Sequence, residues 1–289
     1  MEQVKKQKVL LLGSAGMIGH QIHRKLYETN KYVLYDSSFS HKLSDKTIIL
    51  DLRDLEKSFD VLSRINPDIL INCSGLLIEE SKQNIKDAIL LNAYIPHFLR
   101  EFCDKINSKF IQISTDCVFS GKNPPYTEQS AKDGQSVYAK VKGLGEIDTE
   151  NHLTIRTSVI GPDLKTNGKE LFSWFLNQKK EIDGYYGSIW SGVSSINLGE
   201  SIDLFIDQKI TGIYNFCSPT NISKYELLSM LNRHSNRDLK INKTEGFISD
   251  KTLIDTRKEL DFKLRSYEET VEELLNYTKE SGLYPHYNL

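Results

Sequence analysis

The sequence predicts an α/β fold, in which a doubly wound parallel sheet is followed by a smaller second α/β domain. Short apolar runs alternate with helical patterns over residues 1–162, and this order becomes irregular afterwards. Strands that are buried on both faces of a sheet have continuous apolar sequences, and strands alternating with helices form parallel β-α-β units. A chain of 289 residues is long enough for one large domain with a smaller partner.

Apolar runs that end in small or acidic residues predict the strands of this sheet. The runs are KVLLLG (8–13), YVLYD (32–36), TIILD (47–51), DILINCSG (68–75), KFIQIST (109–115) and LTIRTSVIG (153–161). Between the first two, Ile18, Ile22 and Leu26 have the spacing of one helix face that packs on a sheet. After residue 162, GIYNFCS predicts one more strand, and KELFSWFLNQ, NISKYELLSMLNRH and SYEETVEELLNYTKE predict helices.

The composition argues against several classes of partner. With 37 basic and 39 acidic residues, the chain has no electrostatic footprint for nucleic acid or an anionic membrane. No stretch approaches the roughly 20 apolar residues of a membrane span, and the glycine-broken run near the N-terminus is expected to be mature structure. The four cysteines, Cys73, Cys103, Cys117 and Cys217, lack paired spacing. We therefore expect reduced buried thiols, a cytoplasmic protein and no metal site.

The segment GSAGMIG (13–19) follows the first strand and opens a helix. Gly13, Gly16 and Gly19 allow a tight turn, close approach of the backbone to a pyrophosphate, and close packing of helix on strand. The helix that begins near Met17 and Ile18 offers unpaired N–H groups to the phosphates. In this strand-turn-helix context the motif predicts a dinucleotide site, with NADH or NADPH as the cofactor.

Two acidic residues bear on which dinucleotide is bound. Asp36, at the end of the second predicted strand, is placed to accept hydrogen bonds from the adenosine ribose, which favours NADH. The alternative interpretation of Asp36 is a turn residue, and the serines at 37–38 with His41 and Lys42 are placed to hold a 2′-phosphate instead. Asp51 is expected either to hydrogen-bond the adenine amino group or to cap the following helix.

The segment SVYAKVKG (136–143) places Tyr138 four residues before Lys142, on one helix face. A tyrosine hydroxyl has an unperturbed pKa of about 10, and a nearby ammonium group lowers that pKa. Ser114 and Thr115 put hydroxyl groups at the carboxyl end of the preceding strand, the edge at which open α/β sheets bind ligands. The pattern predicts proton donation to a substrate carbonyl.

Six motifs, in this order and at these intervals, resemble the extended short-chain dehydrogenase/reductases, and within them the dTDP-4-dehydrorhamnose reductase branch. They are GSAGMIG, PDILINCSG, LNAYIPHFL, STDCVFSG, SVYAKVKGLGE and IRTSVIG. The resemblance is strong through residue 161 and looser afterwards. It implies a Rossmann-type NAD(P)-binding domain at residues 1–162, completed by about 197–218, and a substrate-binding domain at 163–196 and 219–289.

The resemblance also implies roles for individual residues. Thr115, Tyr138 and Lys142 would be the catalytic triad, with Tyr138 as general acid and Lys142 also on the nicotinamide ribose. The candidate cofactor-binding residues are Gly13, Ser14, Gly16, Met17, Ile18, Asp36, Asp51, Leu52, Cys73, Ser74, Gly75, Asn92, Tyr138, Lys142 and Thr157. The candidate substrate-binding residues are Asp116, Val118 and Trp190. For Trp190, stacking on the substrate and core packing are equally compatible with the sequence, and the loop around Glu128 is expected to be a solvated surface.

The predicted function is that of an NAD(P)H-dependent reductase acting on a nucleotide-activated 4-keto-6-deoxy sugar for surface polysaccharide. Cys117 stands where the family often has an aromatic residue, and SDKTLIDTRKEL (250–261) lacks an arginine-proline signature, so the sugar and nucleotide stay open. The alternatives are an epimerase or dehydratase of the same superfamily, and a non-catalytic nucleotide-binding regulatory subunit. The expected partners are the nucleotide-sugar and a second copy of the chain in a homodimer.

Overall fold

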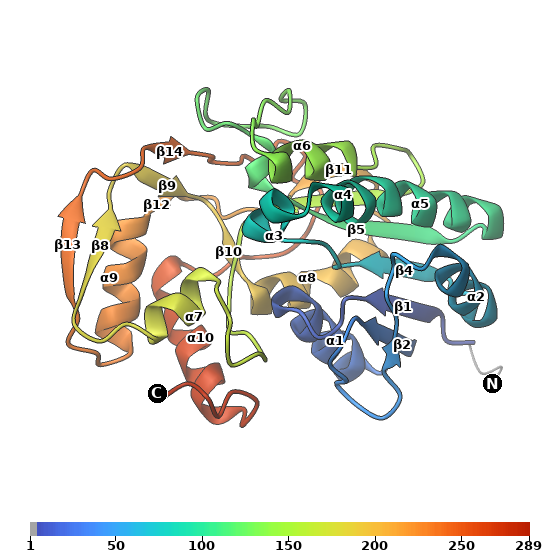
Figure 1. Ribbon diagram of the computed structural model, residues 1–289, viewed down its shortest axis with the longest axis horizontal. Helices are drawn as coiled ribbons and strands as arrows, with labels where there is room; N and C mark the ends of the chain where they lie inside the picture. Colours follow the sequence, from blue (N-terminus) through green and yellow to red (C-terminus); the bar gives the residue numbers. More distant parts are fainter. Residues whose placement is uncertain (1–4) are drawn as a thin grey trace.

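The computed structural model describes residues 5–289 and shows a large lobe and a smaller one side by side (Figure 1). The large lobe is built on a seven-stranded sheet with the strand order β11-β6-β5-β4-β1-β2-β3. Its strands are β1 (Lys8–Leu12), β2 (Val33–Ser38), β3 (Ile48–Ile49), β4 (Ile69–Asn72), β5 (Lys109–Thr115), β6 (Leu153–Thr157) and β11 (Gly212–Asn215). All neighbouring strands in this sheet are parallel. The predicted doubly wound α/β fold is confirmed.

Helices cover both faces of this sheet. They are α1 (Met17–Thr29), α2 (Leu55–Ile65), α3 (Ile78–Gln83), α4 (Ile85–Ala88), the π-helix η1 (Ile89–Tyr94), α5 (Ile95–Ile106), the 3₁₀-helix η2 (Asp116–Val118), α6 (Val137–Leu144) and α8 (Ser195–Asp207). In Figure 1, α1 and α8 lie below the sheet, and α4, α5 and α6 lie above it.

The alternation of side chains along β1 explains why the strand is apolar throughout. Val9 and Leu11 pack in one core cluster with Ile22 of α1 and Phe205 of α8, and all of these side chains are fully buried. Leu10 and Leu12 point to the opposite face, where their cluster contains residues of α2 and α5. A central strand of a doubly wound sheet therefore needs apolar residues at odd and at even positions, because the two sets face opposite sides of the sheet.

The smaller lobe carries short strands and helices around a core of its own. Its elements are α7 (Leu171–Leu176), β8 (Glu181–Tyr185), β9 (Ser188–Trp190), β12 (Ile222–Ser223), α9 (Lys224–His234), β13 (Lys240–Thr244), β14 (Ser249–Asp250) and α10 (Tyr267–Glu280). Phe172, Phe175, Leu231 and Leu274 are buried in its core cluster. The pair β7 (Val159–Ile160) and β10 (Val193–Ser194) lies in the connections between the lobes.

Some predicted boundaries differ from those in the structure. The run at 153–161 forms two strands, because the chain leaves the sheet after Thr157 and β7 pairs with β10 instead of β5. β2 runs two residues past Asp36, to Ser38. The helix α8 was not predicted; Ser194 caps it by accepting a hydrogen bond from the Asn197 N–H at 3.0 Å.

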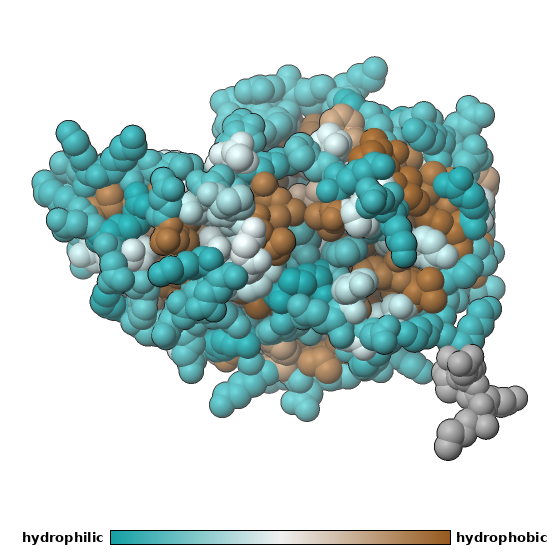
Figure 2. Space-filling model, turned by 90° about the horizontal axis from the view of Figure 1, so that it is seen from below, coloured by the Kyte–Doolittle hydropathy of each residue, from teal (hydrophilic) through white to brown (hydrophobic). Residues whose placement is uncertain are grey.

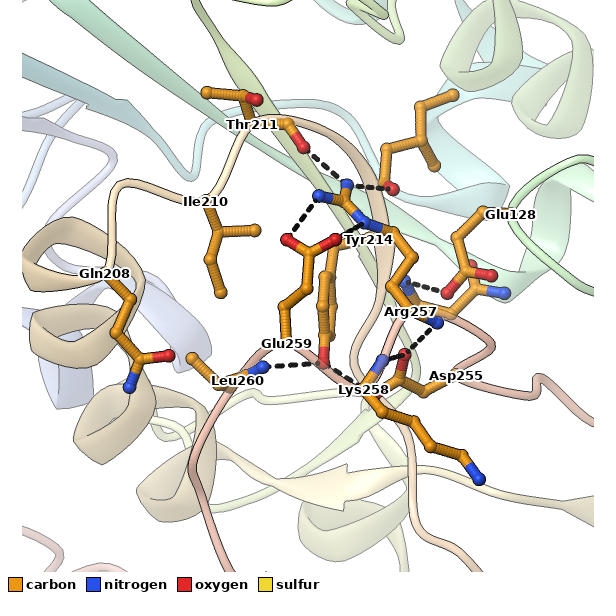
Figure 3. Close-up of polar contacts among 12 residues, drawn as sticks. Glu128, Gln208, Ile210, Thr211, Tyr214, Asp255, Arg257, Lys258, Glu259 and Leu260 are labelled. Atoms are coloured by element: carbon orange, nitrogen blue, oxygen red, sulfur yellow. Dashed lines mark hydrogen bonds and ion pairs between the residues drawn. The ribbon is translucent and has the colours of Figure 1, made fainter.

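A segment at residues 252–260 lies along the edge strand β11, and Figure 3 shows its contacts. The Tyr214 hydroxyl donates a hydrogen bond to Asp255 Oδ2 at 2.5 Å, and Arg257 Nη1 donates to the carbonyl oxygens of Thr211 and Ile213. The Glu128 side chain accepts hydrogen bonds from the backbone and hydroxyl of Thr256. Glu128 itself is only 4% exposed, so the expectation of a solvated position is wrong for this residue, although Gln129, Ala131, Lys132 and Gln135 of the same loop are exposed.

Hydrophilic residues cover most of the smaller lobe on the face seen in Figure 2, while hydrophobic residues gather towards the middle and the large lobe. Between residues 5 and 289, the structure contains no helix with the length and hydropathy needed to cross a membrane. The four cysteines are all free thiols in the structure.

Candidate active site

The turn between β1 and α1 leaves space and donors for a phosphate group. Gly13 has a φ of +80°, and a Cβ atom there would lie 2.9 Å from the backbone nitrogen of Ser74. A Cβ atom on Gly19 would lie 2.1 Å from the Gly13 carbonyl oxygen, so α1 packs directly on the turn. The first turn of α1 has neither a side-chain cap nor an acidic residue. Its backbone N–H groups are thus available to an anion.

A cavity of about 370 Å³ opens beside this turn, at the carboxyl ends of β1 to β4. Its lining residues are Gly13, Ala15, Gly16, Ser37, Ser38, Phe39, Ser40, His41, Leu50, Asp51, Leu52, Arg53, Cys73, Ser74, Gly75, Leu76, Leu77, Glu80, Leu91 and Lys165. This edge of an open parallel sheet is where nucleotides bind, and the cavity has the size of a small-molecule site. The glycine turn, the uncapped helix and the cavity together fit a dinucleotide cofactor.

Seven of the predicted cofactor residues line this cavity: Gly13, Gly16, Asp51, Leu52, Cys73, Ser74 and Gly75. Asp36 is not among the lining residues and is 4% exposed. Its Oδ2 atom accepts a hydrogen bond from Ser14 Oγ at 2.6 Å, and its Oδ1 atom lies 3.7 Å from His23 Nε2. Asp36 and Ser14 are therefore paired beneath the glycine turn, while Ser37 and Ser38 face the cavity.

The alternative role of Asp51 as a helix cap is wrong. Asp54 caps α2 instead, because its side chain accepts the Lys57 N–H at 3.0 Å. Asp51 lines the cavity and forms an ion pair with Arg53, at 2.7 Å between Oδ2 and Nη2. Hydrogen bonds from Arg53 hold the pKa of Asp51 below its usual value. Arg53 also lies over the Phe39 ring, 5.4 Å from the centroid.

Asn92 holds Leu76, a residue of the cavity wall, through two hydrogen bonds. Its side-chain amide donates to the carbonyl oxygen of Leu76 and accepts from the Leu76 N–H, both at 2.9 Å. Asn92 is 2% exposed and fixes the loop after β4. Met17 and Ile18 are the first two residues of α1, and Thr157 ends β6 with its hydroxyl buried and without a hydrogen-bond partner within residues 5–289.

The tyrosine and lysine of SVYAKVKG both lie on α6, which Ser136 caps by accepting the Ala139 N–H at 3.1 Å. Lys142 Nζ donates a hydrogen bond to the carbonyl oxygen of Ile113 in β5 at 2.8 Å. Thr115, two residues further along β5, has its hydroxyl beside the Tyr138 phenol, where it acts to lower the phenol's pKa. The structure thus brings Thr115, Tyr138 and Lys142 together.

Burial, and then the nearby Cys117 and Asp116, raise the pKa of Tyr138 above its ordinary value. Burial likewise lowers the pKa of the Lys142 ammonium to about 8. The pKa of Tyr138 is therefore shifted in the direction opposite to the one expected from Lys142. The physical reason is that burial and the neighbouring Cys117 and Asp116 all disfavour the phenolate, and only the Thr115 hydroxyl favours it. The Lys142 ammonium is hydrogen-bonded to the carbonyl oxygen of Ile113 in β5.

Ser114 does not share the open edge of the sheet with Thr115. Its hydroxyl donates to Glu146 Oε1 at 2.7 Å, and Glu146 also accepts two hydrogen bonds from the guanidinium of Arg156, at 2.9 and 2.8 Å. All three side chains are at most 7% exposed. This network fixes β5, β6 and the end of α6 to one another, and so holds the strand end that carries Thr115.

The three predicted substrate residues have different surroundings. Asp116 follows Thr115, and its Oδ1 atom accepts a hydrogen bond from the Thr115 hydroxyl at 3.1 Å. Val118 is 1% exposed in a core cluster with Phe119 and Tyr126. Trp190 is 4% exposed and belongs to the core of the smaller lobe. Of these three residues, Asp116 is the one whose side chain is hydrogen-bonded to Thr115.

Three charged residues near these groups were missed in the sequence. Arg53 and Lys165 line the cavity, and Lys224 faces the charges of Asp116 and Glu170. Lys165 and Lys224 belong to chain segments that follow the large β-α-β region, so no local spacing relates them to it. Arg53 carried a weak signal, because it follows the acidic end of a predicted strand by two residues.

Comparison with known proteins finds the same family as the motifs. Residues 7–184 match the family model described as the RmlD substrate binding domain. The spore coat polysaccharide biosynthesis protein SpsK of Bacillus subtilis is 26% identical over 234 residues, which is 79% of each chain. Methionine adenosyltransferase 2 subunit beta of Xenopus tropicalis is 24% identical over 237 residues, 76% of this chain and 70% of that one.

Solved structures show the same fold. A dTDP-4-dehydrorhamnose reductase of Clostridium acetobutylicum has a TM-score of 0.80 at 21% identity, over 94% of this chain and 99% of that one. The dTDP-4-dehydrorhamnose reductase of Bacillus anthracis in complex with NADP has a TM-score of 0.79 at 20% identity, over 93% and 99%. A UDP-glucose 4-epimerase of Thermotoga maritima, with UDP-glucose, has a TM-score of 0.81 at 18% identity, over 95% and 99%.

Proposed function

Since the chain belongs to the family of the RmlD substrate binding domain, we propose that it is an NAD(P)H-dependent reductase of a nucleotide-activated 4-keto-6-deoxy sugar. The observation that carries this proposal is the meeting of Thr115, Tyr138 and Lys142 at the end of β5, in the same sheet edge as the dinucleotide cavity. In the same proposal the large lobe binds the cofactor and the smaller lobe, residues 163–196 and 219–289, binds the substrate.

The protein groups have separate tasks in the proposed reaction. A reduced nicotinamide supplies the hydride for the carbonyl carbon. Tyr138 donates its phenolic proton to the carbonyl oxygen, so that the ketone becomes an alcohol, and Thr115 hydrogen-bonds the same oxygen to orient it. Lys142 is held by the carbonyl oxygen of Ile113, on the same helix face as Tyr138, and in this proposal it binds the nicotinamide ribose.

The names of the relatives support the substrate class. A spore coat polysaccharide protein and dTDP-4-dehydrorhamnose reductases are among the similar proteins, and this favours an activated deoxysugar used for a polysaccharide. The free cysteines favour a reducing cytoplasm as the location.

Two rival functions have an observation in their favour. Epimerases that bind UDP-sugars share the fold, so a chain that retains its cofactor and returns the hydride is the first rival. The relatives named methionine adenosyltransferase 2 subunit beta favour a partner protein as the second. The presence of Thr115, Tyr138 and Lys142 together argues against a purely non-catalytic chain.

The test is a panel assay of cofactor oxidation. Purified protein is mixed with NADH or NADPH and with dTDP-, UDP- and GDP-linked 4-keto-6-deoxy sugars, and loss of reduced cofactor is followed by absorbance. We expect stoichiometric oxidation with at least one sugar. An epimerase would be indicated if the protein carried tightly bound cofactor and interconverted sugars without net oxidation. The reductase proposal would be contradicted if sugars were bound but none was turned over.

A further inference from the structure

Lys224 occupies a position that is unfavourable for a lysine on three counts. It is the first residue of α9, whose positive dipole end repels a cation. It is partly buried, and burial lowers the pKa of its ammonium to about 8. None of the residues at 5–289 accepts a hydrogen bond from Nζ or forms an ion pair with it. An ammonium that is partly removed from water without a hydrogen bond or an ion pair is costly for a fold, and such groups concentrate at functional sites.

The backbone and an aromatic ring fix where this ammonium lies. Ser223 and Glu226 form a capping box that sets the first turn of α9, and β12 pairs with β9 so that Ile222 is opposite Trp190. Lys224 Nζ lies over the Trp190 ring, 4.7 Å from its centroid. The indole is in turn held by a hydrogen bond from Nε1 to Ser158 Oγ at 2.9 Å.

Lys224 and Tyr138 face the same charged groups. Asp116, Cys117 and Glu170 act on the pKa of both side chains. Asp116 and Cys117 come from η2 at the end of β5, and Glu170 directly precedes α7 in the smaller lobe. The Trp190 ring beneath the ammonium is hydrogen-bonded to Ser158, and the preceding residue, Thr157, pairs with Thr115 across β5 and β6, so the ammonium lies near the strand ends that carry Thr115. The two carboxylates favour its charged form.

We propose that Lys224 binds a phosphate oxygen of the nucleoside diphosphate in the substrate, with Trp190 as the floor beneath the ammonium. This inference rests on the proposed function, because in a nucleotide-linked sugar the diphosphate is the anionic group next to the sugar ring. Because the Lys224 ammonium faces Asp116 and Glu170, which also act on Tyr138, it is placed to reach the diphosphate. A charge-assisted hydrogen bond at this point positions the sugar without taking part in proton transfer.

The test is a binding titration with the dinucleotide cavity already filled. Protein saturated with NADPH is titrated with dTDP, UDP and GDP, and with the corresponding nucleosides, which lack phosphate. A hydrogen bond to a charged group contributes about 1.5–3 kcal/mol, so Lys224→Met should weaken diphosphate binding about 10- to 100-fold. Lys224→Arg should retain most of the affinity, and nucleoside and NADPH affinities should not change.

Lys243 provides a matched control. It is an exposed lysine of the smaller lobe whose Nζ lies 5.6 Å from the Tyr186 ring centroid, and Lys243→Met should leave every affinity unchanged. Lys224→Met should change the melting temperature little, since it removes no hydrogen bond or ion pair within residues 5–289 and keeps an unbranched side chain beside Trp190. The assignment would be overturned if Lys224→Met bound diphosphates as tightly as wild type does. It would also be overturned if the variant lost affinity for nucleosides and diphosphates to the same extent.

The proposed reaction and this assignment can fail separately. If the wild-type protein reduces a keto sugar and Lys224→Met has the same KM, the role of Lys224 is wrong and the reductase stands. If Lys224 is needed for diphosphate binding but no keto sugar is reduced, the site stands and the reaction is wrong. A wild-type protein that binds none of the three diphosphates contradicts both.

Discussion

Lys142 Nζ donates a hydrogen bond to the carbonyl oxygen of Ile113 at 2.8 Å, which ties α6 to the middle of β5. One helical turn before Lys142 lies Tyr138, and two residues after Ile113 lies Thr115, so this one contact brings the phenol and the hydroxyl to the same end of the strand. The Ile113 oxygen also accepts a hydrogen bond from the Gln112 side chain at 2.8 Å. Replacement of Lys142 would therefore not leave that carbonyl without a partner.

The first prediction concerns Lys142→Met and pH. Burial lowers the folded-state pKa of Lys142 to about 8, below its ordinary value of 10.5. Below pH 8 Lys142 is charged in both the folded and the unfolded protein, and the folded protein bears the full cost of removing that charge from water. Between pH 8 and about 10.4 the unfolded state binds more protons, so this cost is relieved as pH rises. We expect Lys142→Met to be at least as stable as wild type at pH 7, with the difference shrinking towards pH 10.

Urea unfolding at several pH values between 7 and 10 measures this difference, and Lys140→Met, at an exposed position of α6, is the control. The cofactor Kd should rise in Lys142→Met and stay constant in the control. A stability difference that grows with pH would contradict the buried charge.

The sequence predicted the large lobe well because its signals are local. Apolar runs such as residues 8–12 fill both faces of a parallel sheet, and the glycine turn and the Tyr138–Lys142 spacing each lie within one strand-turn-helix or one helix. These features depend on neighbours in the chain, and the structure reproduces them.

The misses come from contacts between distant residues. Asp36 was expected at a ribose, and the hydrogen bond that its carboxylate accepts from Ser14, across the turn from β2, is a contact that the sequence did not indicate. Lys224 faces Asp116, which is more than a hundred residues away in sequence, so no motif relates the two. A local pattern cannot distinguish a residue facing a site from one in the core, as Val118 shows.

The second prediction concerns Trp190→Ala. The indole is 4% exposed, stacks near Tyr267 at 5.5 Å between centroids, and supports Lys224. Truncation of a buried tryptophan costs about 3–5 kcal/mol, so the melting temperature should fall clearly. The substrate KM should rise while cofactor affinity is retained. Thermal unfolding and kinetics with both ligands measure these effects, with exposed Trp174→Ala as control. An unchanged melting temperature would show that Trp190 is not part of the core.

The third prediction concerns the segment along β11. Arg257 donates hydrogen bonds to the carbonyl oxygens of Thr211 and Ile213 and lies 5.5 Å from the Tyr214 ring centroid (Figure 3). Arg257→Ala should lower the free energy of unfolding by about 2 kcal/mol, since charged hydrogen bonds to a strand edge are lost. Denaturant titration tests this against Lys263→Ala, at an exposed position three residues beyond that segment. Equal stability of the two variants would contradict a supporting role for Arg257.

The fourth prediction concerns cofactor choice. The Asp36 carboxylate accepts the Ser14 hydroxyl beneath the glycine turn and does not line the cavity. Asp36→Asn should therefore weaken the binding of NADH and of NADPH by similar factors, because the glycine turn that both cofactors contact loses the Ser14 hydrogen bond. Titration of each cofactor gives the ratio, and Asp45→Asn at an exposed position is the control. A ratio that moves strongly towards NADPH would show that the carboxylate reaches the ribose, as the sequence first indicated.

The last prediction concerns Tyr138, whose pKa burial raises above its ordinary value and whose neighbour Thr115 offsets this in part. A phenol that stays protonated at neutral pH is a donor held ready for a carbonyl oxygen. Tyr138→Phe keeps the ring and removes the proton, so cofactor affinity should be retained while kcat falls about 10²- to 10⁴-fold, the usual contribution of general acid catalysis. The matched control is Tyr94→Phe, at a residue that is 50% exposed on η1, and its kcat should equal that of wild type. The measurement is kcat on whichever keto sugar the panel identifies, together with single-turnover rates that isolate the chemical step. If Tyr138→Phe kept more than about a tenth of the wild-type single-turnover rate, Tyr138 would not be the proton donor, and the hydroxyl of Thr115 or bound water would have to supply the proton.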